Sequence, residues 1–195
     1  MKITIDQILA WDPCVYYDTR EKIIEKTDSN WPKTPLQIAH LDIPARDRMW
    51  VLLRPEIIPE YQLHLLACDF AEEVLPIFEK RYPNDKRPRV VIETKRKWVA
   101  GEVADEELDA AAADAAAAAV YAADAADAAD AAYAAYAAAD AAYAAADAAY
   151  AASARAADAA SARAAYADAA YAAWETVEIR EKQLQQVIDV LEDTK

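Results

Sequence analysis

The stretch Ala131-Ala-Tyr-Ala-Ala-Tyr-Ala-Ala-Ala-Asp-Ala-Ala-Tyr-Ala-Ala-Ala-Asp-Ala-Ala-Tyr150 decides the fold of this chain. It belongs to a longer segment, residues 110–173, in which 44 residues are Ala, eight are Asp and seven are Tyr. Alanine has the highest helix propensity. Residues 102–195 also contain neither Gly nor Pro, so they lack the turn residues that a sheet needs. The segment therefore predicts long helices and an all-α fold.

The spacing of the polar residues predicts how these helices are organised. Tyr136, Tyr143 and Tyr150 recur every seven residues with Asp140 and Asp147 on the same side, which leaves an alanine face opposite for packing. Upstream, Asp and Tyr recur every three residues, a spacing that drifts by roughly 60° per step around a straight helix. One helix over residues 105–195 would be about 135 Å long. We therefore expect an antiparallel bundle of two or three Ala-rich helices.

The Asp and Tyr side chains of this segment are candidate binding residues. Two Ser-Ala-Arg units, eight residues apart, add two Arg side chains to the set. The pattern has a second explanation in repeat expansion, because codons for Ala, Asp and Tyr can differ by one base. The candidates are Asp124, Asp127, Asp130, Tyr133, Tyr136, Asp140, Tyr143, Asp147, Tyr150, Arg155 and Arg163.

The first half of the chain has an ordinary composition and predicts a mixed helical domain over residues 1–103. The remainder, residues 104–195, is then an Ala-rich acidic region that ends in an amphipathic helix with Leu184, Val187, Ile188 and Leu191 on its apolar stripe. In the first half, caps and prolines predict short helices after Thr4, at Thr34-Pro35 and at Ile43-Pro44, and apolar spacing predicts a longer helix over Glu60–Arg81. The next helix is expected from Pro88 to Gly101, with Val90, Val91, Lys95 and Trp98 along it. A further helix is expected to begin near Asp105. Trp11, Trp31, Trp50 and Trp98 are expected to add bulk to the core of this half.

Charge is distributed unevenly along the chain. Residues 1–100 are balanced, whereas residues 101–195 hold 19 acidic and five basic residues and account for the net charge of −14. The negative electrostatic field of this region repels nucleic acid and anionic membranes and favours a basic protein partner. The negative charge has a second explanation, because it also keeps an Ala-rich chain in solution. The basic residues of 86–89 and 95–97 are expected to dock against the acidic half or to form the solvent face of a helix.

No residue cluster predicts catalysis, a cofactor or a metal site. His64 and Cys68 lie four residues apart, but no third ligand is near, so both are expected to be buried. Cys14 and Cys68 do not form a disulfide framework. The start of the chain has no apolar signal region, and charged residues interrupt the alanines, so we expect a cytoplasmic protein with no membrane span.

The segment from Arg87 to Glu102 carries a resemblance to a known family. It contains Arg87-Pro88, Ile92-Glu93, Arg96-x-Trp98 and Gly101-Glu102, and residues 65–72, Leu-Leu-Ala-Cys-Asp-Phe-Ala-Glu, precede it. In these motifs the chain resembles the Ala-rich predicted immunity proteins of bacterial toxin systems, which also occur in phage genomes. The resemblance covers about residues 45–170 and implies an all-α fold and neutralisation of a partner. Relatives often place Trp, Arg, His or Gly where this chain has Tyr and Asp.

Three functions, none of them enzymatic, are consistent with these features. The first is an immunity or inhibitor protein that meets a basic protein surface with its Asp and Tyr residues. The second is a phage counter-defence protein that sequesters a small nucleotide ligand or mimics nucleic acid. The third is a structural protein that forms homo-oligomers through alanine faces. We favour the first, acting in the cytoplasm of a bacterial or phage-infected bacterial cell.

Overall fold

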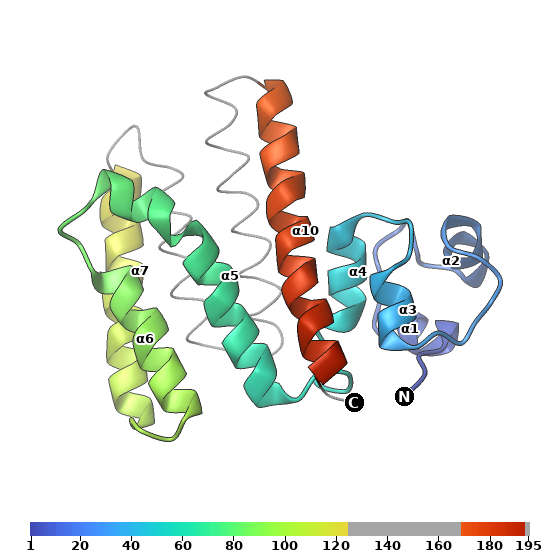
Figure 1. Cartoon of the computed structure of the whole chain (residues 1–195), viewed down its shortest axis with the longest axis horizontal. Coiled ribbons are helices and arrows are strands. Elements are labelled where there is room, and N and C mark those ends of the chain that lie inside the picture. The colour runs from blue at the N-terminus through green and yellow to red at the C-terminus, as the bar shows by residue number, and fades with distance from the viewer. Residues whose placement is uncertain (125–168, 194–195) are drawn as a thin grey trace.

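The computed structural model describes residues 1–124 and 169–193, which form eight helices (Figure 1). The helices are α1 (Ile5–Ala10), α2 (Arg20–Lys26), α3 (Pro35–Ala39), α4 (Ala45–Leu52), α5 (Glu60–Arg81), α6 (Arg87–Val99), α7 (Asp105–Asp124) and α10 (Ala169–Asp193). The predicted all-α fold is confirmed. The antiparallel bundle predicted for the Ala-rich helices falls largely on residues 125–168, outside the described residues.

Local capping signals explain where the short helices begin. Thr4 and Thr34 each form a capping box, in which the threonine hydroxyl accepts a hydrogen bond from the N3 backbone N–H and the side-chain oxygen of the N3 glutamine accepts one from the backbone N–H of the cap. At α2 only the first of these bonds is present, from the backbone N–H of Lys22 to the Thr19 hydroxyl. The sequence did not predict α2, because its seven residues contain only two apolar positions.

Helices α5, α6 and α7 run in alternating directions and lie next to one another (Figure 1). Helix α5 has the predicted bounds and continues through Pro76. Gly101 ends α6 as predicted, and its φ of +75° is in the left-handed region that glycine adopts without strain. Helix α7 then turns a buried face toward the core, made of Leu108, Ala112 and Ala115.

Helix α10 returns to the first half of the chain and packs against α3, α4 and α5. Its predicted stripe is confirmed, because Leu184, Val187, Ile188 and Leu191 are all buried. These side chains join one continuous core that runs from Ile3 to Leu191, with Trp11, Trp31, Trp50 and Trp98 packed against it as predicted. The division at residues 103 and 104 stays a prediction.

Val90 departs from the predicted apolar positions of α6, because it is 47% exposed. The buried positions of this helix are Pro88, Val91, Ile92, Thr94 and Lys95, a spacing that leaves Val90 on the solvent side. Across residues 1–124 and 169–193, no helix is both long and apolar enough to cross a bilayer.

Candidate functional site

The basic residues around α6 are paired with acidic residues of the first half of the chain. The guanidinium of Arg89 binds Glu79 of α5 through two hydrogen bonds, with both N···O distances 2.7 Å. Arg96 bridges two further carboxylates of α5, Asp69 at 2.7 Å and Glu72 at 2.8 Å. Of the two alternatives predicted for this cluster, docking against the acidic half is not what Arg89 and Arg96 do, because α5, in the first half of the chain, supplies their carboxylates.

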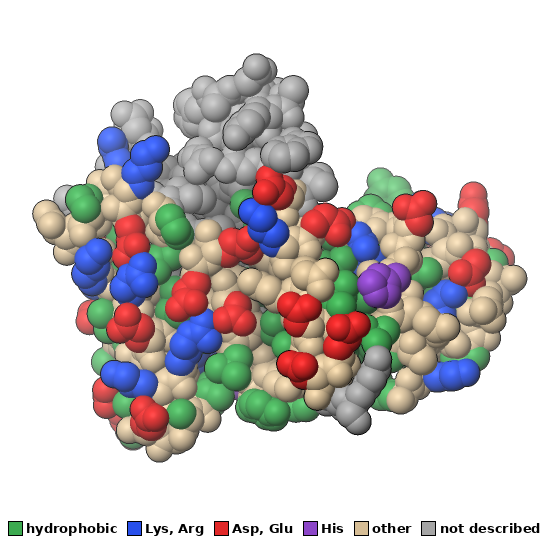
Figure 2. Space-filling model, in the orientation of Figure 1, with side chains coloured by type: hydrophobic (Ala, Val, Ile, Leu, Met, Phe, Trp, Pro, Cys, Tyr) green, Lys and Arg blue, Asp and Glu red, His purple; other side chains and the backbone are tan. Residues whose placement is uncertain are grey.

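These ion pairs change the electrostatics of the groups that form them. The hydrogen bonds from Arg89 lower the pKa of the Glu79 carboxyl below its ordinary value. Arg87 acts in the same way on the neighbouring Asp85. The basic charges of α6 are thereby partly neutralised within the fold, which weakens their use as a nucleic-acid surface. Figure 2 shows acidic and basic side chains side by side over α5 and α6.

A buried aromatic and cationic group lies where α5, α6 and the start of α7 meet. The Lys95 Nζ lies 4.0 Å from the centroid of the Trp98 ring, and Lys95 is only 1% exposed. Burial lowers the pKa of Lys95 to about 8. The His64 ring meets the same indole edge to face at 5.1 Å, and the Trp98 Nε1 donates a hydrogen bond to Asp105.

This group anchors Trp98 of the Arg96-x-Trp98 motif against the core. His64 and Cys68 are buried, as predicted, and burial raises the pKa of the Cys68 thiol to about 12. Within the described ranges, no three His, Cys, Asp or Glu side chains gather in a way that could hold a metal ion. Trp98 joins α6 to α7, so the motif positions the acidic helix that follows it.

Helix α7 carries an acidic face on the side opposite its buried residues. Its sequence contains six acidic residues and no basic residue. Four of its exposed carboxylates, Glu106, Glu107, Asp109 and Asp114, form what we term the α7 acidic face. Leu108, Ala112, Ala115 and Ala118 are buried on the other side. The C-terminal end of α10 adds exposed acidic residues, which gather over that end in Figure 2.

Most of the predicted binding residues lie outside the described part of the chain. Asp124 is the last residue of α7. The other ten candidates, Asp127, Asp130, Tyr133, Tyr136, Asp140, Tyr143, Asp147, Tyr150, Arg155 and Arg163, fall within residues 125–168. The role assigned to them stays a prediction. The α7 acidic face lies directly before these residues in sequence and is acidic like them.

A cavity of about 530 Å³ lies among α1–α4, at the other end of the molecule from α7. Its walls include Tyr16, Tyr17, Trp31 and Trp50. The sequence did not predict this site, because its lining comes from many short segments between Ile8 and Val51 that share no periodic pattern. The density of Trp and Tyr between residues 11 and 50 is the one signal that points to it.

The described residues thus define an all-α protein with an acidic surface helix and with its basic motif paired inside the fold. Residues 56–191 match the family described as Imm-5 like putative immunity protein, and the chain belongs to this family. The match confirms the resemblance drawn from the Arg87–Glu102 motifs and extends through α10. The family's general role is immunity, which implies a protein toxin as the partner. No curated protein and no solved structure matches the chain.

Proposed function

We propose that this chain is a non-enzymatic immunity protein that binds a toxin through an acidic surface and thereby neutralises it. The surface combines the α7 acidic face with the Asp and Tyr residues that follow it in sequence. The observation that supports this proposal most directly is the exposure of four carboxylates on a helix without a basic residue. The toxin surface that fits it is basic, and the place of action that we propose is the bacterial cytoplasm.

The separation of charge along the fold supports a basic partner. Arg89 and Arg96 of α6 lie against Glu and Asp side chains of α5, so they compensate charge locally. The acidic residues of α7 follow immediately in sequence without basic neighbours on their own helix. An acidic patch of this kind steers a basic protein during diffusion and raises the association rate, most strongly at low salt.

Tyrosine is suited to the second part of the proposed surface. Its ring is large and rigid and its hydroxyl forms hydrogen bonds, which is why tyrosine is enriched in protein interfaces. Carboxylates around such rings would orient a basic partner, while the rings would supply the buried contact area. Arg155 and Arg163 of the Ser-Ala-Arg units belong to the same proposed set of binding residues.

The test compares two variants of equal charge change for binding to a basic protein toxin that the wild-type chain binds. The first variant neutralises the α7 acidic face with Glu106→Gln, Glu107→Gln, Asp109→Asn and Asp114→Asn. The matched control neutralises exposed acids at the other end of the molecule with Asp12→Asn, Glu21→Gln, Glu25→Gln and Asp42→Asn. Affinity is measured by calorimetry, and association rates are measured at 50 and 300 mM NaCl.

We expect the α7 variant to weaken binding by about tenfold or more, or about 1.4 kcal/mol, and the control variant to change it less than about twofold. The association rate of the wild type should fall by about tenfold over this salt range. Equal affinity of both variants, or a rate that does not depend on salt, would contradict the proposed surface. Melting temperatures of both variants show whether each remains folded.

The other two functions give different results with the same material. A nucleotide that raises the melting temperature would favour sequestration of a small nucleotide ligand. A mass that rises with protein concentration would favour a structural homo-oligomer. Neither outcome is expected for a protein whose ligand is a toxin.

A further inference from the structure

The cavity among α1–α4 is shaped by three parts of the chain that converge on it. The loop Pro13–Tyr17 forms one wall, α2 and the loop with Trp31 form a second, and α3 and α4 form a third. The rim includes Val15 and Tyr16, which are 69% and 67% exposed. A volume of about 530 Å³ is within the range of small-molecule sites in proteins.

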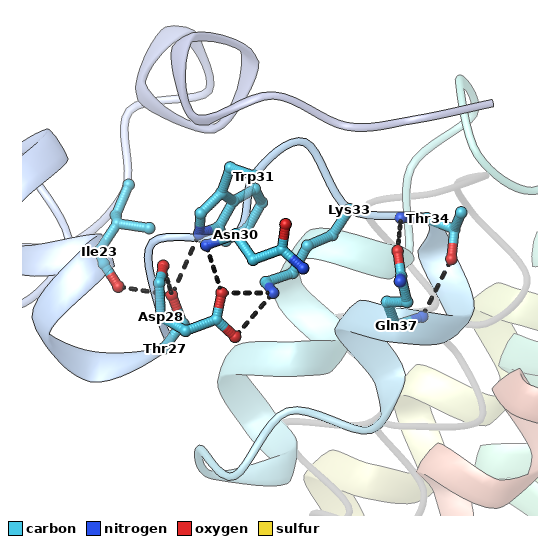
Figure 3. A network of polar contacts seen from close by, with 8 residues as sticks. All are labelled: Ile23, Thr27, Asp28, Asn30, Trp31, Lys33, Thr34 and Gln37. Carbon is cyan, nitrogen blue, oxygen red and sulfur yellow. Dashed lines mark hydrogen bonds and ion pairs between the residues drawn. The ribbon is translucent and has the colours of Figure 1, made fainter.

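Hydrogen bonds hold the wall around Trp31 in place (Figure 3). The Trp31 Nε1 donates to the Thr27 hydroxyl at 3.2 Å, and that hydroxyl donates to the carbonyl of Ile23 at 2.7 Å. Lys33 reaches back to both carboxylate oxygens of Asp28 at 2.8 Å. Trp31, Thr27 and Ile23 all line the cavity, so this network fixes the shape of the wall before a ligand arrives.

The opposite wall is fixed in the same manner. The Tyr17 hydroxyl donates a hydrogen bond to the Asp47 carboxylate at 2.9 Å, which ties the loop to α4. The Lys22 Nζ holds the loop at the carbonyl of Val15, at 2.8 Å, and at Asp18, at 2.7 Å. The aromatic side chains of the lining thus come from two segments that are fixed independently.

The polar groups of the lining restrict the chemistry of that molecule. Most of the lining is aromatic or aliphatic, which favours an uncharged ligand. Asp47 already accepts one hydrogen bond from Tyr17, and a carboxylate can accept several. A ligand with an N–H group could therefore bind the same carboxylate. Arg46 also lines the cavity, so its positive charge accompanies the negative charge of Asp47, and the lining as a whole favours a neutral ligand.

We propose that this cavity binds a small, uncharged aromatic heterocycle that stacks on its aromatic walls and donates an N–H hydrogen bond to Asp47. The site is distinct from the proposed toxin surface. Its lining, between Ile8 and Val51, precedes residues 56–191 that match the immunity family. Residues 1–55 also contain eight basic and eight acidic residues, so this part of the chain lacks the acidic excess.

Cys14 has an exposed thiol in the lining of the cavity, so its reactivity can report whether a ligand occupies the cavity. The second cysteine, Cys68, is fully buried, so alkylation by iodoacetamide reports on Cys14. The experiment measures the rate of Cys14 alkylation by intact mass while indole is added as the probe. We expect saturating indole to slow the reaction at least fivefold, because an occupant of the cavity covers the thiol. No protection at the solubility limit of indole would overturn the proposal.

Two matched comparisons separate binding in the cavity from nonspecific effects. Tyr16→Ala should raise the indole concentration needed for protection at least fivefold, whereas Tyr61→Ala, a similarly exposed tyrosine outside the lining, should leave it unchanged. 1-Methylindole, which lacks the N–H group, should protect at least fivefold less well than indole. That difference should disappear in Asp47→Ala, which removes the acceptor. Equal protection by both probes in the wild type would rule out the role of Asp47, and an unaffected Tyr16→Ala variant would rule out the cavity.

Discussion

Lys95 has the least exposed charged side chain among residues 1–124 and 169–193, at 1%. Removal of an ammonium group from water is unfavourable, and the lowered pKa of Lys95, about 8, reflects that burial. The Trp98 ring, 4.0 Å from the Nζ, offsets part of the penalty by a cation–π interaction. Because Trp98 also binds Asp105 and contacts His64, this lysine sits at the junction of three helices.

Replacement of Lys95 by Met should change how stability depends on pH. The native pKa of Lys95 is about 8, and the unfolded value is roughly 10.4. Between these values the unfolded chain binds more protons, so the contribution of Lys95 to stability rises with pH and is lost as pH falls through 8. The free energy of unfolding of the wild type, relative to Lys95→Met, should rise by about 2 kcal/mol between pH 7 and pH 9.5.

Urea denaturation of both proteins at the two pH values measures this difference directly. Methionine keeps the unbranched shape of the lysine side chain, so the comparison isolates the amine. A difference that stays constant from pH 7 to pH 9.5 would show that the amine does not lose its proton in that interval.

At the scale of elements, the contact between α6 and α7 depends on the small size of alanine. The buried alanines of α7 recur at positions 112, 115 and 118, so beyond Leu108 the buried face of the helix carries small methyl side chains. Gly101 reverses the chain directly before this contact. Such a face permits close approach of two helices, but it leaves no room for a longer side chain.

Ala112→Leu should therefore destabilise the protein by about 1 to 3 kcal/mol, because three additional carbons must enter a filled interface. Ala113→Leu is the matched control, since Ala113 is the next residue on the same helix and is exposed. It should change the free energy of unfolding by less than about 0.5 kcal/mol. Thermal denaturation followed by circular dichroism measures both, and equal effects would contradict the assigned orientation of α7.

The elements also show what can be predicted from sequence here and what cannot. The bounds of α5, the caps at Thr4 and Thr34 and the stop at Gly101 follow from local chemistry, so they were predicted correctly. Helix α2 was missed because two isoleucines do not form a detectable period. The partners of Arg89 and Arg96 on α5 were not predicted, because pairing between helices depends on tertiary contacts that composition does not encode. The cavity was missed for the same reason.

For the molecule as a whole, α10 connects the end of the described chain to its beginning. Leu184 and Val187 are buried in the same core as Met49 and Leu52 of α4. At the surface, the Arg48 guanidinium binds Glu181 at 2.7 Å and donates to the carbonyl of Ala39 at 3.0 Å. The stability of α3 and α4 is therefore expected to depend on α10.

Leu184→Ala should lower the free energy of unfolding by about 2 to 5 kcal/mol, as expected for a fully buried leucine. The exposed neighbour Gln185→Ala is the control and should have little effect. Urea unfolding followed by tryptophan fluorescence and by circular dichroism should shift to lower urea with both probes. If circular dichroism alone shifts, the first half of the chain unfolds independently, and the predicted division between residues 1–103 and 104–195 gains support.

The contact between Arg48 and Glu181 joins residues that are 133 positions apart, and this separation has a consequence during synthesis. At typical translation rates, Arg48 is made roughly 7 to 27 s before Glu181. For that interval the nascent α3 and α4 present to the cell the apolar faces that α10 later covers. Until α10 has been synthesised, these apolar faces lack the helix that covers them in the fold and are open to aggregation.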